Sequence, residues 1–411
     1  MTGNGRRQFV LLLATLVVTQ TGLHAARPLI SYRTIAMGGG GFEVGIAAAA
    51  FAALSVLAAM PLGRFTDRTG RTLTLLVIGT VLCAASIGWL ALAADPLAVA
   101  ASSTALGFAH VLLMVGAQGH VATIATDDQL DGGFGAMTAS VSAGQLLGPL
   151  LAGFALGPGQ VGVAGSAWAA GLAAAVAAAA IPLAVCLALT ARTRNAPRRP
   201  APDPADRIGS LELTRRPGIA SALLTSMALL TAVDILTAYL PLVAHDRAVD
   251  ATAVGLLLGL RAAASLASRI GIGRLAARWG HDLLVTASTV GSGVALAVIA
   301  LPVSSMAVLV PTALIGGFLL GIGQPLTMTL VVRSVPATSR GAALALRLVS
   351  NRVGQVVLPT LAAVGTGWLG AAGALWFSAA VLAASGLAHR FDARTPARSA
   401  PSGLRGGRRR W

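Results

Sequence analysis

The sequence has no lysine and few charges of any kind. Asp, Glu, Lys and Arg together form 11% of its 411 residues, whereas a soluble protein averages about 25%. So few charged side chains cannot cover a surface that faces water. The composition therefore excludes a soluble globular protein.

Cysteine is nearly absent, and the usual signatures of catalysis are missing from the sequence. Cys83 and Cys186 each stand alone in an apolar stretch, which excludes a disulfide framework. The sequence has no His-Glu-x-x-His, no Gly-x-Ser-x-Gly and no pair of His or Cys at metal-ligand spacing. We therefore expect neither an enzyme nor a bound metal or cofactor, and a membrane-embedded enzyme or sensor is disfavoured.

Apolar residues are what the sequence has in excess: they form 55% of it, and the mean hydropathy is +0.79. A helix needs about 20 mostly apolar residues to cross a bilayer. Apolar segments of about this length occupy residues 9–31, 43–62, 73–94, 97–121, 134–155, 167–189, 218–243, 251–272, 283–301, 306–331, 341–364 and 370–388. We predict an all-α membrane protein with twelve transmembrane helices.

The net charge of +16 comes from arginines, and these are concentrated in particular segments outside the predicted helices. Most of them lie before the first helix, in the loops after the second, sixth, eighth and tenth helices, and after the last one. By the positive-inside rule, both termini are expected in the cytoplasm and the protein in a bacterial-type inner membrane. The basic loops then face anionic lipid headgroups, and no nucleic-acid partner is expected. Arg27, Arg33 and Arg247 are expected at or near the opposite face.

The two halves of the chain repeat each other at an offset of 210 residues. The pairs that match are Gly63-Arg64 with Gly273-Arg274, Gly107-Phe108 with Gly317-Phe318, Gly144-Gln145 with Gly354-Gln355, and Pro149 with Pro359. We predict two six-helix bundles, 1–190 and 218–389, joined by a proline-rich cytoplasmic linker, 191–217, and followed by a basic tail, 390–411. The repeat needs the first apolar segment as a helix, so Arg6-Arg7 is not interpreted as a twin-arginine export signal. Paired halves of this kind place a substrate site between them near the midplane.

A polar motif lies between the second and third predicted helices. It runs from Gly63 to Arg71 with Asp67, Arg68 and Gly70 in between, and it resembles the G-x-x-x-D-R-x-G-R signature of the major facilitator superfamily. Glycines permit a tight turn, and the Asp67 carboxylate can accept from a helix N-terminus of the other half. The resemblance implies a gating loop.

The fifth predicted helix carries a second motif, Gly144-x-x-x-Gly148-Pro149-x-x-Ala152-Gly153. It is similar to the motif associated in this superfamily with proton-coupled efflux antiporters, with Ala152 in place of one glycine. Small residues four apart let helices approach closely, and proline removes a backbone hydrogen bond. The motif is therefore open to two interpretations, a packing face or a mark of antiport.

Two positions depart from the pattern of the resembling families. Ala277 replaces the acid in the C-terminal copy of the gating motif, so that copy has lost its carboxylate. Ser103 stands ahead of Gly107 where related antiporters often carry an arginine, which weakens any transfer of a proton-relay role to the fourth helix.

Asp234 is the one acid well inside a predicted helix, and charges at this depth usually mark a pathway or an ion pair. Arg347, Asn351 and Gln355 form a stripe on the eleventh helix, next to Arg352. Equal distances from the cytoplasmic helix ends predict that Asp234 pairs with Arg352 or Arg347, as similar sugar permeases pair an acid with a base between these helices. Asp234 is then either a structural counter-ion or a proton carrier, and both interpretations remain open.

Further polar residues fall on the helices that the resemblance implies line the substrate cavity. They are Gln20, His24, Arg27, His110, Arg261 and Gln324, together with Asn351 and Gln355 of the eleventh helix. His24 is either a packing residue or a second proton site. Several arginines against one acid predict a positive cavity, which favours an anionic or hydroxyl-rich substrate.

The function favoured by these features is export of small organic molecules by proton antiport through alternating access. The alternative is a proton-coupled uptake symporter for a sugar or a carboxylate. The expected partners are a small-molecule substrate, protons and the lipid bilayer, with the protein acting as a monomer.

Overall fold

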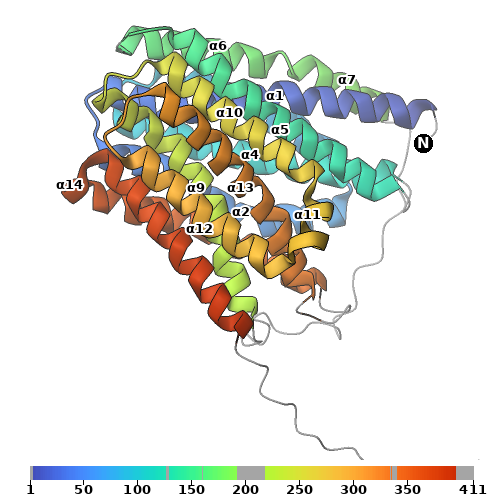
Figure 1. Cartoon of the computed structure of the whole chain (residues 1–411). Coiled ribbons are helices and arrows are strands. Elements are labelled where there is room, and N and C mark those ends of the chain that lie inside the picture. Colours follow the sequence, from blue (N-terminus) through green and yellow to red (C-terminus); the bar gives the residue numbers. More distant parts are fainter. Residues whose placement is uncertain are drawn as a thin grey trace, which may run out of the picture.

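The computed structural model describes residues 3–125, 129–159, 161–191, 218–333, 335 and 340–394, and in these the secondary structure is helical (Figure 1). The linker beyond residue 191 and the tail beyond residue 394 lie outside the described residues. The helices are α1 (Gly3–Ala36), α2 (Gly41–Thr69), α3 (Thr72–Leu92), α4 (Pro96–Ile124), α5 (Leu130–Leu156), α6 (Val163–Ala178), α7 (Ile181–Ala191), α9 (Ile219–Asp246), α10 (Ala251–Ile270), α11 (Ile272–Trp279), α12 (His281–Ala300), α13 (Met306–Arg333) and α14 (Arg340–Arg394).

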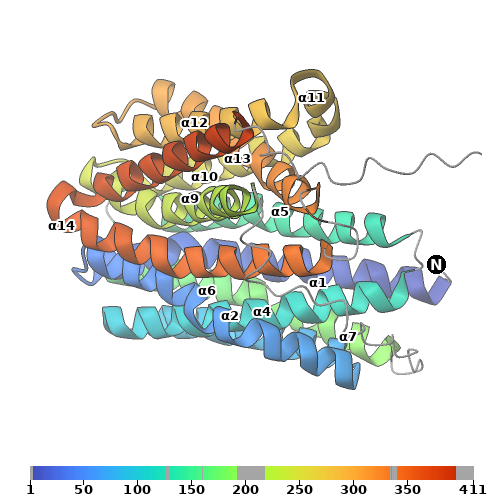
Figure 2. The same cartoon turned by 90° about the horizontal axis from the view of Figure 1, so that it is seen from below.

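Eleven stretches of the described chain are long and apolar enough to cross a membrane, and the last, Leu346–Phe391, contains 46 residues. At about 1.5 Å per residue it would be roughly 69 Å long, more than twice the hydrocarbon thickness of a bilayer. Gly370 divides it, with φ 63° and ψ −169°, a conformation open to glycine. In Figure 2 the two arms of α14 run back from this point with α9 between them. The twelve predicted crossings are therefore present, with α6 and α7 sharing one of them.

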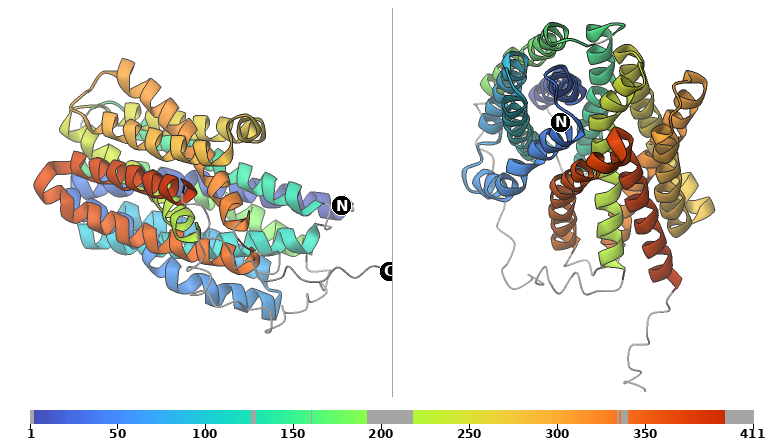
Figure 3. Two further views of the ribbon diagram at one scale, coloured as in Figure 1. Left: turned by 60° about the horizontal axis from the view of Figure 1, so that its bottom comes forward. Right: turned by 90° about the vertical axis from the view of Figure 1, so that its left-hand side faces the viewer.

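The crossings form two bundles, shown in the right-hand panel of Figure 3 as a blue-to-green group beside a yellow-to-red group. In the first bundle α1 packs on α5 and α6, and α3 packs on α4 and α6. In the second, α9 packs on α14, and α13 packs on α10 and α12. The bundles meet mainly where α5 contacts α10 and where α2 contacts α14, with α1 touching α9 between these seams.

Glycines bring the bundles together at the end where α2 begins. A Cβ at Gly45 would lie 2.5 Å from the Ala363 Cβ, and one at Gly41 would lie 2.7 Å from the Thr366 Cβ. The Tyr239 hydroxyl donates a hydrogen bond to the Gly41 carbonyl at 3.0 Å. This end of the interface therefore has no room for larger side chains on α2.

The gating motif differs from the predicted loop. α2 continues to Thr69, so most of the motif is helical, and Gly70 ends the helix with φ 66° while its N–H donates to the Thr66 carbonyl. The tight turn thus depends on Gly70, whereas a Cβ at Gly63 would meet nothing within 4 Å. Arg68 and Arg71 are exposed. The Asp67 side chain lies outside what the structure describes, so its predicted role as a latch stays a prediction.

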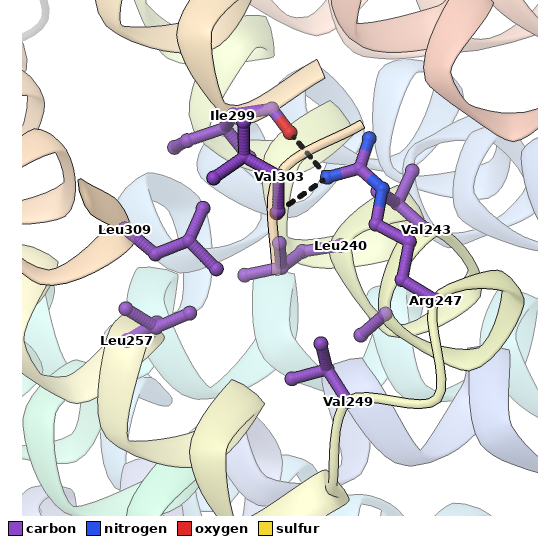
Figure 4. Close-up of a pocket in the computed structure, with 9 residues that line it drawn as sticks. Leu240, Val243, Arg247, Val249, Leu257, Ile299, Val303 and Leu309 are labelled. Atoms are coloured by element: carbon purple, nitrogen blue, oxygen red, sulfur yellow. Dashed lines mark hydrogen bonds between the residues drawn. The ribbon is translucent and has the colours of Figure 1, made fainter. Parts of the chain in front are cut away.

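Two arginines far from the basic loops cap helix ends. Arg33 is buried and donates to the carbonyls of Ala93 and of Val163, the latter at 2.7 Å. Arg247 donates to the carbonyls of Ile299 at 2.8 Å and Val303 at 3.4 Å (Figure 4), and also to that of Ala300 at 2.8 Å. The last carbonyls of a helix lack partners within it and carry partial negative charge.

The two caps occupy matching places, because Arg33 lies near the end of α1 and closes α3, while Arg247 follows α9 and closes α12. Burial lowers the pKa of Arg247 and Asp246 raises it, but an arginine stays charged at neutral pH. These two exceptions to the positive-inside pattern are therefore explained by local capping.

Replacing Arg33 by Met should lower the thermal stability of the detergent-solubilised protein, because it leaves the buried Ala93 carbonyl at the end of α3 without this donor. We expect a loss of about 2 kcal/mol or more, read as a lower unfolding temperature. Arg64→Met removes the same charge from an exposed position on α2 and is the matched control. Equal unfolding temperatures for the two variants would contradict the capping role.

Replacing Gly45 by Leu should force the bundles apart at the start of α2. A cysteine placed at Thr366, in a protein with Cys83 and Cys186 replaced, should then react several-fold faster with a membrane-impermeant maleimide. Gly88→Leu is the control, since a Cβ at Gly88 meets nothing within 4 Å. An unchanged rate in the Gly45 variant would show that close packing at Gly45 does not control access of the maleimide to position 366.

Candidate functional site

The Asp234 carboxylate, midway along α9, binds groups from both bundles. Its Oδ1 accepts from Arg27 Nη2 of α1 at 2.6 Å, and its Oδ2 accepts from Gln355 Nε2 of α14 at 2.7 Å. The side chains of Arg27 and Asp234 are only 11% and 17% exposed, so the ion pair is largely shielded from its surroundings. One carboxylate thus connects the N-terminal bundle to two helices of the C-terminal bundle.

The predicted pairing of Asp234 with Arg352 or Arg347 is wrong at the level of direct contact. Arg352 Nη1 donates to Gln355 Oε1 at 3.0 Å and reaches Asp234 only through this amide. Arg347 Nη2 donates to Gln324 Oε1 of α13 at 3.0 Å. The depth argument compared α9 with α14 alone, and it placed Arg27 near the opposite face. Arg27 instead lies against α9, where the two bundles meet.

An aromatic side chain that the sequence reasoning missed supports the ion pair. The Arg27 guanidinium carbon lies 4.2 Å from the centre of the Phe51 ring of α2, within the range of a cation–π interaction. The Phe51 ring in turn lies 6.0 Å from the His110 ring of α4. Phe51 belongs to an apolar run, and nothing in that run distinguishes a ring that holds a cation from one that faces lipid.

Several of the polar residues expected to line the cavity have buried atoms without protein partners in the described part of the chain. They are Gln20 Oε1, His24 Nε2, both ring nitrogens of His110, Arg261 Nε, Gln324 Nε2 and Asn351 Oδ1. Buried polar groups usually have a hydrogen-bond partner. Donors and acceptors that the protein leaves unpaired in one region mark it as able to bind a polar molecule.

The charge of this region is dominated by arginine. Asp234 interacts electrostatically with Arg261 and Arg352 as well as with its direct partner Arg27. His24 lies within Coulombic range of Arg27, Arg261 and His110. Among these described side chains three cations share one carboxylate, so the site carries an excess of positive charge.

The helix-5 motif packs closely against the part of α1 that carries Gln20 and His24. A Cβ at Gly144 would lie 2.5 Å from the Gln20 Cβ, and one at Gly148 would lie 2.6 Å from the Ala25 backbone nitrogen. Gly153 contacts the other bundle, since a Cβ there would lie 2.9 Å from the Gly255 Cα of α10. A Cβ at Gly255 would also lie 2.5 Å from the Pro149 carbonyl oxygen. The motif therefore packs one helix against partners in both bundles and holds the polar face of α1 in place.

The gating motif is not part of this cluster. Phe51 and Gly63 are both on α2 but twelve residues apart, which is roughly 18 Å along a helix. Gly63, Arg68, Gly70 and Arg71 thus lie toward one end of the bundle, away from the ion pair.

Comparison with known proteins places this geometry in a family. The family model described as Major Facilitator Superfamily matches residues 11–247 and 222–411. The comparison with curated proteins found no match. Among solved structures, the fold is similar to the nucleoside transporter NupG, with a TM-score of 0.72 and 13% identity over 96% of this chain and 100% of that chain.

Two further transporters have the same fold. A bacterial homologue of the human lysosomal transporter Spinster, in an inward-facing and occupied conformation, has a TM-score of 0.73 and 16% identity over 95% of this chain and 97% of that chain. A POT family transporter in complex with 5-aminolevulinic acid has a TM-score of 0.73 and 14% identity over 93% and 95%. With its two bundles and a family model that matches nearly its whole length, this chain belongs to the major facilitator superfamily of membrane transporters.

Proposed function

We propose that this transporter exports small organic molecules by proton antiport, with both termini in the cytoplasm. The observation that carries the proposal is the Asp234 carboxylate, which joins Arg27 of one bundle to Gln355 of the other. Twelve crossings place the two ends of the chain on one side, and the basic loops favour the cytoplasm for that side.

Protonation of Asp234 would couple to the movement of the bundles. The ionised carboxylate attracts Arg27 across the interface, and the neutral acid loses that attraction. Arg27 would then face Arg261 and Arg352 without a counter-ion nearby, which favours separation of the bundles at this point. Loading and release of one proton thereby bias the two arrangements that alternating access requires.

The substrate chemistry decides between antiport and symport at such a site. A hydroxyl-rich neutral molecule would donate hydrogen bonds to the Asp234 carboxylate and accept them from Arg27. Its binding then competes with protonation of the same carboxylate, and mutual exclusion of substrate and proton produces antiport. The unpaired atoms of Gln20, His24 and Asn351 supply the further donors and acceptors for such a molecule.

The excess of arginine favours a second candidate, proton-coupled uptake of a carboxylate or another anion. An anionic group that binds Arg27 would leave Asp234 without its counter-ion and so promote its protonation. Substrate and proton would then bind together, which produces symport. The charge of the transported molecule thus predicts the direction of coupling.

The decisive experiment uses liposomes that contain the protein and a pH-sensitive dye. Neutral polyols and sugars, carboxylates and drug-like compounds are added under an imposed pH gradient. We expect a neutral hydroxyl-rich compound to drive protons opposite to its own movement, and Asp234→Asn to abolish this flux in protein that is still folded in detergent. Co-directional flux with a carboxylate would replace antiport by symport. Proton-coupled flux that survives in Asp234→Asn would show that the acid is a structural counter-ion.

Two arginine variants separate direct from indirect partners of Asp234. Arg27→Gln removes the contacting cation, so the pH dependence of transport should shift relative to that of the unchanged protein. Arg347→Gln is the matched control, because Arg347 binds Gln324 rather than Asp234. Equal shifts in the two variants would show that overall charge, and not the ion pair, sets the pH dependence.

A further inference from the structure

A cavity of about 450 Å³ lies in the C-terminal bundle, outside the polar site. It is lined by Ile272, Gly273, Ala276 and Ala277 of α11, by His281 at the start of α12, and by Pro325, Leu326 and Thr329 of α13. His281 and Thr329 contribute its polar side chains, and the remaining lining is apolar. Its size is in the range of cavities that hold small organic ligands.

The cavity sits where the chain leaves the membrane. The span of α10 ends at Ile270 and the span of α12 begins at His281, so α11 connects them at the boundary. Ile270 is 87% exposed and Trp279 is 57% exposed on the two sides of this connection. Tryptophan is enriched at the level of lipid headgroups. The wall formed by α13 lies within its span, which ends at Val332.

In the N-terminal bundle glycines bring two helices into close contact at the corresponding place. At the offset of 210 residues, Leu326 and Thr329 correspond to Gly116 and Gly119 of α4. A Cβ at Gly116 would lie 2.5 Å from the Leu76 backbone nitrogen of α3, so α3 and α4 are in close contact there. In the C-terminal bundle the side chains of Leu326 and Thr329 line the cavity instead.

Two arginines and one acid lie near the cavity, and the acid, Asp282, next to His281, has His389 Nε2 at 3.5 Å from its carboxylate. Arg274 and Arg278 lie one turn apart on the exposed face of α11, next to the lining residues Gly273 and Ala277. α11 contains no acid, since Ala277 stands where the N-terminal copy has Asp67. An apolar cavity at a membrane boundary, with two exposed arginines beside it, matches a molecule with a hydrocarbon part and an anionic headgroup.

We propose that this cavity is a binding site for an anionic phospholipid of the leaflet that α11 faces. The acyl and glycerol portion occupies the space between α11 and α13, and the phosphate lies against Arg274 and Arg278. The proposal does not depend on the transported substrate or on the direction of proton coupling.

The test is native mass spectrometry of the full-length protein with phosphatidylglycerol or phosphatidylcholine. We expect one retained phosphatidylglycerol and weaker retention of phosphatidylcholine. Arg274→Gln with Arg278→Gln should reduce phosphatidylglycerol affinity about 30-fold, the equivalent of about 2 kcal/mol for two arginines at a membrane surface. Arg64→Gln with Arg68→Gln makes the same charge change in the N-terminal copy and should leave retention unchanged.

A second variant tests the cavity itself and keeps the arginines. Ala277→Trp places a large side chain at its exposed rim and should displace the lipid without lowering the unfolding temperature in detergent. Inorganic phosphate at millimolar concentration should not compete, because it lacks the apolar part. Retention that persists in Ala277→Trp, that is lost only in the N-terminal double variant, or that phosphate abolishes would overturn the proposal.

Discussion

The arrangement of this transporter depends on one ion pair in a place where charges are costly. Asp234 and Arg27 come from different bundles and lie 2.6 Å apart, largely shielded from solvent. Within a membrane an isolated carboxylate or guanidinium is strongly unfavourable, and in a low-dielectric interior a pair is tolerated only with good geometry and further hydrogen bonds. Gln355 and the Phe51 ring supply those further contacts. The two bundles are thereby connected at the place where the unpaired polar groups gather.

Close packing of α1 by glycine makes this geometry possible. Gly144 and Gly148 let α5 approach the backbone of α1 beside Gln20 and His24, so larger side chains there would move the polar face of α1. Gly153 makes a similar approach to α10 in the other bundle. A motif associated by resemblance with antiport thus acts here through contact. It contains no group that moves a proton, and what it does in the structure is to hold α5 close to α1 and to α10.

The two bundles share a repeat but have different details at their basic ends. The N-terminal copy has a polar motif that includes Asp67, and it has glycines on α4 that allow close contact with α3. The C-terminal copy has Ala277 in place of the acid and Leu326 and Thr329 in place of the glycines, and these three residues line a cavity. Both copies keep an arginine that caps the carbonyl end of the third helix, since Arg33 and Arg247 satisfy the same need. The two halves therefore remain alike where helix-end carbonyls need a donor, and they differ where side chains only pack against one another.

The sequence by itself determined the class of protein, the number of crossings and the presence of two bundles. These properties depend on composition and on apolar length, because the bilayer imposes one thickness and a heavy cost on charge along the whole chain. Helix ends were less predictable: α2 runs seven residues past its predicted end at 62, since a polar helix can continue into water. The partner of Asp234, the ring under Arg27 and the cavity beside α11 were decided only by the tertiary structure. Each depends on the rotation and tilt of helices that are distant in sequence, and depth along a single helix does not specify which neighbour its side chains will face.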